Sequence, residues 1–315
     1  MPTVDTINLA DVQSRKTQWL WNRYIPMGTV TVLLGDGGLG KSFLSLAIAA
    51  AVTKGLLLPG NSAGAKPANV IVQNAENALP TVVKPRLELL GADCSKVHCI
   101  NENESRLTLT DERIEAAIIQ HKARFVVIDP VQSYLGMGIS MNRAESIRLV
   151  FTKLEQVAER CKCAVLLVGH LNKSGGKAQY RGLGSVDIFN SVPSVLYLGK
   201  SDDDDTRVLV HGKSNLDETG PSLEIKLSKR DGFEWLGESD MTLEELLANR
   251  PGARGSRLEE AGEFLRDILA EGRMPATEIE AIAADSGITL RTLERAKKSV
   301  GVNVTRANGH WHWSL

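Results

Sequence analysis

Apolar runs alternate with segments of helical periodicity over the first two thirds of the chain. Four runs rich in β-branched and other apolar residues have the pattern of buried strands: 29–34, 70–73, 125–129 and 163–169. Four further segments carry apolar residues at helical spacing: 43–54, 78–90, 109–121 and 144–160. Strands that are apolar throughout and alternate with helices predict an α/β fold, with a mostly parallel, twisted sheet covered on both faces.

The pattern changes in the following part of the chain. Runs of strand type then follow one another with short polar connections, at 194–198, 206–213 and 223–227. Helices are missing between these runs, so we expect antiparallel strands that extend the sheet.

The last 80 residues predict a second, smaller domain. Residues 237–256 contain Arg250-Pro-Gly-Ala-Arg-Gly-Ser256, a composition typical of a linker. Helical patterns follow at 258–271, 276–286 and 289–300, with Thr289 as an N-cap, and then an extended end that carries Trp311 and Trp313. This is the outline of a winged helix, in which we expect both tryptophans to close the small core. The predicted organisation is an arm (1–18), an α/β domain (19–236), a linker (237–256) and a winged-helix-like domain (257–315).

Composition limits the classes of function. The formal net charge is −1 and aromatic residues are 5% of the chain, which argues against a nucleic-acid-binding surface spread over the whole protein and leaves local sites open. The four cysteines have no zinc-like spacing and suit a reducing compartment. Neither a signal-like apolar segment nor a run of about 18 apolar residues occurs, so the expected location is the cytoplasm, without a membrane partner.

A complete phosphate-binding motif lies between the first strand and the first helix. Gly35-Asp-Gly-Gly-Leu-Gly-Lys-Ser42 fits G-x-x-x-x-G-K-[ST]. Glycines let backbone N–H groups surround phosphates, the lysine reaches the β- and γ-phosphates, and the serine hydroxyl binds Mg²⁺. The sequence therefore predicts ATP and Mg²⁺ as cofactors. The predicted nucleotide-binding residues are Gly35, Asp36, Gly37, Gly38, Leu39, Gly40, Lys41, Ser42 and Phe43.

Three residues at strand ends complete the predicted site. Asp129 follows four apolar residues, the Walker B pattern, and is expected to bind Mg²⁺ with Ser42. Glu76 follows the second strand, where RecA-type ATPases carry their catalytic glutamate, and this similarity implies a general base; the alternative is a surface glutamate at a helix start. His170, after the fourth strand, is a candidate γ-phosphate sensor, with a local hydrogen-bonding role as the alternative.

These motifs, in this order, resemble the RecA-fold P-loop ATPases related to the hexameric plasmid replicative helicase RepA. The resemblance covers about residues 19–227. It rests on these segments: Ile25-Pro26, the GDGGLGKS loop, Asn74-Ala-Glu76, Lys84-Pro-Arg-Leu87, Val126-Val-Ile-Asp-Pro130, Gly169-His-Leu-Asn-Lys173, Arg181-Gly-Leu-Gly-Ser185 and Lys213-Ser-Asn-Leu216.

The resemblance implies a ring of subunits, with a hexamer expected, in which a basic residue of one protomer reaches the γ-phosphate bound by its neighbour. Arg181 and Lys213 match the positions of such residues. Arg181 can instead belong to a DNA-facing loop. Relatives often have an arginine where this chain has Asn190-Ser-Val-Pro-Ser194, so Pro193 puts the trans-acting role in question.

Two regions are candidates for DNA contact. The resemblance implies that the loops at 135–143 and 171–184 line the channel of the ring; the second contains Lys173, Lys177 and Arg181, and its alternative is a solvent loop. The last predicted helix carries Arg291, Arg295 and Lys298, which suit a recognition helix, although winged helices also bind proteins.

The leading hypothesis is thus an ATPase motor on single-stranded DNA, of the ring-forming replicative-helicase type, with a replication initiator or a primase as further candidate partners. A filament-forming recombination or repair ATPase and an ATP-switched DNA-binding regulator remain alternatives. A metabolic kinase is disfavoured by the candidate trans-acting residues and the C-terminal domain.

Overall fold

The structure is a computed structural model that describes residues 6–136, 144–171, 191–201, 205–228, 232–248, 261–262, 264–270, 272–285, 288–307 and 310–315. The chain divides into two units, Met1–Leu247 and Ala248–Leu315. Lys173, Lys177 and Arg181, which the sequence places at a channel or subunit contact, lie outside the described residues.

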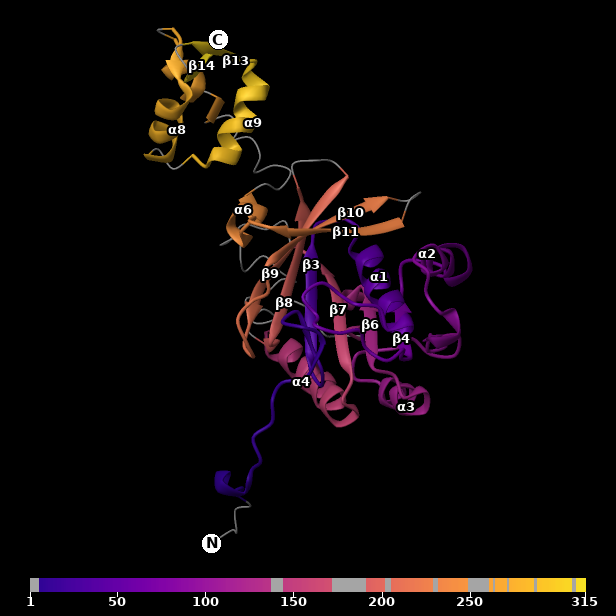
Figure 1. The fold of residues 1–315 in the computed structure, drawn as a ribbon. Coiled ribbons are helices and arrows are strands. Elements are labelled where there is room, and N and C mark those ends of the chain that lie inside the picture. The colour runs from indigo at the N-terminus through magenta and orange to yellow at the C-terminus, as the bar shows by residue number, and fades with distance from the viewer. Residues whose placement is uncertain are drawn as a thin grey trace. The chain divides into compact units, whose positions relative to one another are not determined.

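A large sheet forms the centre of the first unit (Figure 1). Its nine described strands have the order β11-β10-β9-β8-β3-β7-β6-β4-β5. Their bounds are β3 Val30–Gly35, β4 Val70–Asn74, β5 Val97–His98, β6 Phe125–Asp129, β7 Ala164–His170, β8 Ser194–Lys200, β9 Thr206–Ser214, β10 Ser222–Ser228 and β11 Gly232–Ser239. A separate short hairpin, β1 (Trp19–Trp21) with β2 (Ile25–Pro26), precedes the sheet.

The pairing confirms the predicted α/β class. The strands from β8 to β5 run parallel, and β9, β10 and β11 continue the sheet in antiparallel pairs. The sequence did not predict β11. Side chains from Phe233 to Leu236 alternate in burial, and the ring of Trp235 packs edge-on against that of Trp21 in β1, so an aromatic contact holds one face of the strand.

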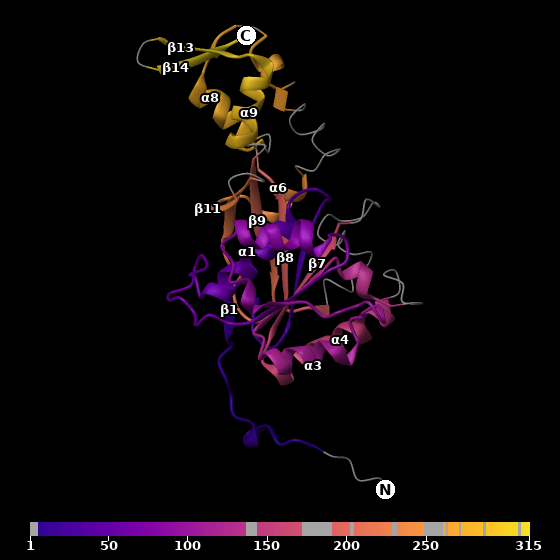
Figure 2. The same ribbon diagram turned by 90° about the vertical axis from the view of Figure 1, so that its right-hand side faces the viewer.

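Helices cover both faces of the sheet (Figure 2). Their bounds are α1 Lys41–Lys54, α2 Lys84–Leu89, α3 Glu112–His121 and α4 Ala144–Cys161. Side chains of α3 and α4 pack in one apolar core with one face of the strands, and α1 and α2 pack with the other. Short helical turns lie at Leu9–Asp11 (η1), Leu79–Val83 (η2), Cys94–Lys96 (η3) and Val131–Tyr134 (η4).

Helix α3 begins three residues later than the sequence pattern indicates. Asp111 accepts a hydrogen bond from the backbone N–H of Arg113 and so acts as the N-cap. Leu109, which the pattern included in the helix, is buried before it and its backbone N–H donates to Tyr134 O at 2.7 Å.

The range predicted as a linker, 237–256, is in part ordered structure. Strand β11 extends to Ser239, and helix α6 (Leu243–Ala248) follows. Leu246 and Leu247 are buried, and a Cβ added at Gly199 would lie 2.4 Å from Leu246 Cδ1. Helix α6 thus packs on β8, because its two leucines complete the apolar core on that side of the sheet.

The second unit contains helices and a small sheet. Residues 264–268 are helical, α8 spans Ala276–Asp285 and α9 spans Leu290–Val300. Thr289 caps α9 as predicted, by accepting from the backbone N–H of Thr292. The strands β12 (Met274–Pro275), β14 (His310–Ser314) and β13 (Asn303–Ala307) pair in that order.

The expectation that both C-terminal tryptophans close this core was wrong for one of them. Trp313 is 2% exposed and joins the cluster with Leu265, Ile279 and Leu293. Trp311 is 55% exposed, with the guanidinium of Arg306 over its ring. Among the described residues, no helix is long and apolar enough to cross a membrane.

Candidate ATPase site

The phosphate-binding loop joins the end of β3 to the start of α1. Gly40 precedes the helix with a φ of +92°, which favours glycine, and a Cβ there would lie 2.4 Å from Leu227 Cδ1. At Gly35, a Cβ would lie 2.5 Å from the backbone oxygen of Leu198 on the neighbouring strand. Glycine is therefore favoured at position 40 by the backbone conformation and at position 35 by the close approach of the β8 backbone.

Lys41, the first residue of α1, is folded back over the loop. Its Nζ donates to Gly35 O at 2.9 Å and to Asp36 O at 2.7 Å, and the residue is 5% exposed. Burial lowers the pKa of Lys41 to about 8, opposed by the negative charges of Asp129, Asp36 and Glu76. Burial removes water from the ammonium and so destabilises its charge. A phosphate group beside it would stabilise that charge through charge-assisted hydrogen bonds, which agrees with the role that the motif predicts for Lys41.

Asp129 lies at the carboxyl end of β6, 3% exposed. Burial raises the pKa of its carboxyl group; a hydrogen bond with Ser42 and the charge of Lys41 act in the opposite direction, and Glu76 adds to the rise. The sequence placed Ser42 and Asp129 together as magnesium ligands, and the structure brings the hydroxyl and the carboxylate into contact. A hydroxyl and a carboxylate are the oxygen ligands that Mg²⁺ prefers. A cation beside the buried carboxylate would also stabilise its charged form.

Asn74 organises the end of the neighbouring strand, a role that the sequence analysis did not assign. It pairs in register with Asp129, and its Nδ2 donates to Asp129 Oδ2 at 3.2 Å. Its Oδ1 accepts from the backbone N–H groups of Glu76 at 3.1 Å and Asn77 at 2.7 Å. Asparagine often starts such turns, and here its side chain positions both the carboxylate of Asp129 and the backbone at Glu76.

Glu76 and His170 meet at the same edge of the sheet. His170 ends β7, in register with Gly35 of the phosphate loop. Its Nδ1 lies 3.3 Å from Lys41 Nζ, and its Nε2 lies 3.7 Å from Glu76 Oε1. The side chains of both Glu76 and His170 are about half exposed, so they face the space where phosphates and water would meet.

Comparison with known proteins agrees with this geometry. The model of the AAA domain family matches residues 1–176, more than half of the chain, and this range contains the phosphate loop, Glu76, Asp129 and His170. The chain belongs to the AAA domain family. Its sheet, loop and strand-end residues make this AAA domain a P-loop core of the RecA-like type.

One curated relative extends the comparison beyond the AAA domain. The chain is 27% identical over 247 residues to the DNA repair protein RadA of Streptococcus pneumoniae (strain ATCC BAA-255 / R6), an alignment that covers 78% of this chain and 52% of RadA. The chain thus spans about half the length of that relative.

Lys213 lies away from the phosphate loop of its own AAA domain. It pairs with Val195 of β8, which in turn pairs with Val32 in the middle of β3, three residues before Gly35. From strand spacing and rise, the Cα atoms of Lys213 and Gly35 are on the order of 14 Å apart. Its Nζ donates to Val192 O at 2.9 Å, beside Pro193, and burial lowers the pKa of its amine.

The predicted DNA-binding residues of α9 belong to the second unit. Arg291 and Lys298 are exposed and Arg295 is half-buried. Lys297 of the same helix pairs with Glu294, and its Nζ lies 4.3 Å from the centroid of the Trp313 ring. Lys297 is therefore bound within its own unit.

Proposed function

We propose that this chain hydrolyses ATP with Mg²⁺ and couples hydrolysis to DNA as a ring-forming motor of the replicative-helicase type. The observation that supports it most is the position of His170, which lies between Lys41 and Glu76. The chain continues directly from His170 into the basic segment 171–184. The side chain of His170 would thus connect the phosphate-binding residues to the segment proposed to bind DNA.

The residues of the site have separate roles in this proposal. The loop from Gly35 to Ser42 and the Lys41 ammonium hold the β- and γ-phosphates, and Ser42 and Asp129 hold Mg²⁺. A bound Mg²⁺ would offset the negative charge of the phosphates. Glu76 positions the attacking water and accepts its proton, while Asn74 keeps Glu76 and Asp129 in place.

Assembly into a ring would complete the site between subunits. Lys213 is directed away from its own phosphate loop, which suits a residue that acts on a neighbour's nucleotide. Arg181 is the other candidate for this role. We propose a hexamer in the cytoplasm, single-stranded DNA as the substrate of movement, and a winged-helix domain at 257–315 that contacts DNA, a replication initiator or a primase.

A second candidate, a recombination or repair ATPase, is favoured by one observation, the similarity to the protein named DNA repair protein RadA. Such an ATPase would use the same site on a filament rather than in a ring. An ATP-switched regulator is the third candidate and depends on duplex binding by the second unit.

The deciding experiment is the steady-state ATPase rate with and without single-stranded DNA, with Lys41→Ala as the blank. A rate that rises several-fold with DNA and vanishes in Lys41→Ala supports a DNA-dependent motor. An ATPase rate that single-stranded DNA does not change contradicts the motor hypothesis and favours the ATP-switched regulator.

Electron micrographs with DNA and a strand-displacement assay then separate the first two candidates. Closed rings and displacement of a paired strand support the helicase type. Filaments without displacement favour recombination or repair.

A further inference from the structure

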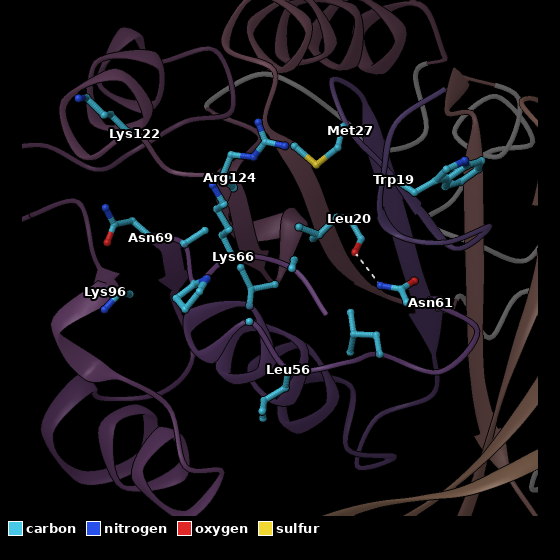
Figure 3. A pocket seen from close by; sticks show the side chains of 16 residues that line it. Trp19, Leu20, Met27, Leu56, Asn61, Lys66, Asn69, Lys96, Lys122 and Arg124 are labelled. Atoms are coloured by element: carbon cyan, nitrogen blue, oxygen red, sulfur yellow. Dashed lines mark hydrogen bonds between the residues drawn. The ribbon is translucent and has the colours of Figure 1, made fainter. Parts of the chain in front are cut away.

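A cavity of about 470 Å³ lies at the end of the sheet opposite the phosphate loop. Figure 3 shows the side chains that line it. Its wall includes Val52 near the end of α1 and Arg124 at the start of β6. Lys41 starts the same helix and Asp129 ends the same strand, so each element separates the cavity from the ATP site by about 16 Å. The cavity and the ATP site are therefore distinct.

The wall of this cavity carries four cationic side chains and no acidic one. None of its sixteen lining residues is acidic. Its four cations come from separate places along the chain: Lys66, Lys96, Lys122 and Arg124. Lys96 is paired with Asp93, whereas the other three have no acidic partner among the described residues. Like charges gathered in one concave site raise the local positive potential, which favours an anionic ligand.

The other part of the cavity is apolar. Trp19, Leu20, Met27 and Leu58 line it, together with Leu56, which is 58% exposed. In the view of Figure 3, Lys122 and Lys96 lie on the left, Lys66 and Arg124 lie nearer the centre, and Trp19 lies on the right. The amides of Asn61 and Asn69 also lie in the wall. A cavity of this volume with an apolar wall and a few polar groups has the usual character of a small-ligand site.

We propose that this cavity is a second ligand site, which binds a phosphate group carried on an apolar or aromatic body, the chemistry of a nucleotide. The cations around Arg124 would bind the phosphate, and the surface of Trp19, Leu20 and Met27 would bind the base. The ligand is a free mononucleotide or a phosphorylated end of a nucleic-acid strand, since both present the same groups. The site acts apart from ATP hydrolysis and does not depend on the function proposed above.

The test is a titration followed at the Met27 methyl group by NMR of the full chain labelled at its methionine methyls, with Met27→Leu to assign the signal. The probes are adenosine 5′-monophosphate, inorganic phosphate and a 5′-phosphorylated oligothymidylate. We expect a saturable shift of the Met27 signal that is unchanged in Lys41→Ala, since the monophosphate lacks the groups that the phosphate loop holds. Binding should weaken at least about tenfold in Lys122→Glu and in Arg124→Glu.

Lys162→Glu is the matched control. Lys122 and Lys162 each follow a helix with φ near +50° and each precede a strand, but Lys122 alone lines the cavity. Equal melting temperatures of the two variants will show that both are folded. A shift caused by the oligonucleotide alone supports the site and identifies a strand end as its source. The proposal is overturned if neither nucleotide probe shifts Met27, if inorganic phosphate binds as tightly as the mononucleotide, or if Lys162→Glu weakens binding as much as Lys122→Glu.

Discussion

Nδ1 of His170 lies 3.3 Å from Nζ of Lys41, while Nε2 of the same ring lies 3.7 Å from Oε1 of Glu76. A charged lysine can only donate, so in this contact the ring nitrogen of His170 is the acceptor. One imidazole thus lies between the lysine proposed to hold phosphate and the glutamate proposed as the base. A change in the nucleotide at Lys41 would reach Glu76, and the segment after His170, through this ring.

Replacing His170 should separate nucleotide binding from hydrolysis. In His170→Ala we expect the ATP dissociation constant to change less than about threefold, since backbone amides and Lys41 still hold the phosphates. The turnover number should fall about 10- to 100-fold and stimulation by single-stranded DNA should disappear. His170→Gln, which keeps a hydrogen-bonding group, should recover part of both. Full stimulation in His170→Ala would contradict the link.

Glu76→Gln tests the assignment of the base. Loss of a general base typically lowers the rate by about 10²- to 10⁴-fold, so kcat should fall in that range while ATP binding is retained. The control is Glu88→Gln, which changes an exposed glutamate paired with Lys84 on α2. A kcat in Glu76→Gln close to that of Glu88→Gln would rule out Glu76 as the base.

Asn74→Ala removes a positioning residue without touching the reacting groups. The variant loses the hydrogen bond to Asp129 and the two accepted from the backbone at Glu76 and Asn77. We expect kcat to fall about tenfold and the Mg²⁺ concentration for half-maximal rate to rise. A purely structural role would lower the melting temperature but leave the Mg²⁺ dependence unchanged, which separates the two explanations.

ATP binding should weaken as the pH rises through the pKa of Lys41. Burial lowers that pKa to about 8, so the unliganded protein loses the ammonium above this pH. Bound phosphate favours the charged form, and binding above pH 8 should therefore take up protons. Between pH 7 and pH 9 the affinity should fall about tenfold, as measured by calorimetry in buffers of different ionisation enthalpy. The fall should be absent from Lys41→Ala.

Two glycines of the phosphate loop should differ in their effect on stability. In Gly35→Ala the new Cβ would lie 2.5 Å from the backbone oxygen of Leu198, which cannot move aside easily. In Gly37→Ala it would meet no atom within 4 Å. Urea unfolding should show a loss of about 1 to 3 kcal/mol for Gly35→Ala and a much smaller change for Gly37→Ala. Equal losses of unfolding free energy in the two variants would show that the close contact of Gly35 with β8 does not cause the destabilisation.

Local sequence patterns were sufficient to predict most elements of the α/β domain and the phosphate loop. Strand β6 has the predicted bounds because Phe125 to Ile128 are apolar throughout and Asp129 ends the run. The spacing of the glycines before Lys41 also located the phosphate loop, because the backbone of such a loop needs residues without a Cβ. Strand β11 and helix α6 were missed because their side chains are only partly apolar and are held by contacts with β10, β8 and the core formed elsewhere in the chain.

The sequence by itself determined the α/β class, the phosphate loop and the identity of Glu76, Asp129 and His170 as candidates, because each follows from a short segment read in order. Only the tertiary structure decided which of them meet. Neighbouring parallel strands place Asn74 beside Asp129 and Gly35 beside His170, residues that are far apart along the chain. The same packing turned Lys213 away from its own loop, buried Trp313 but not Trp311, and gathered four distant cations around one cavity. These outcomes depend on the register and order of the strands, which no single segment encodes.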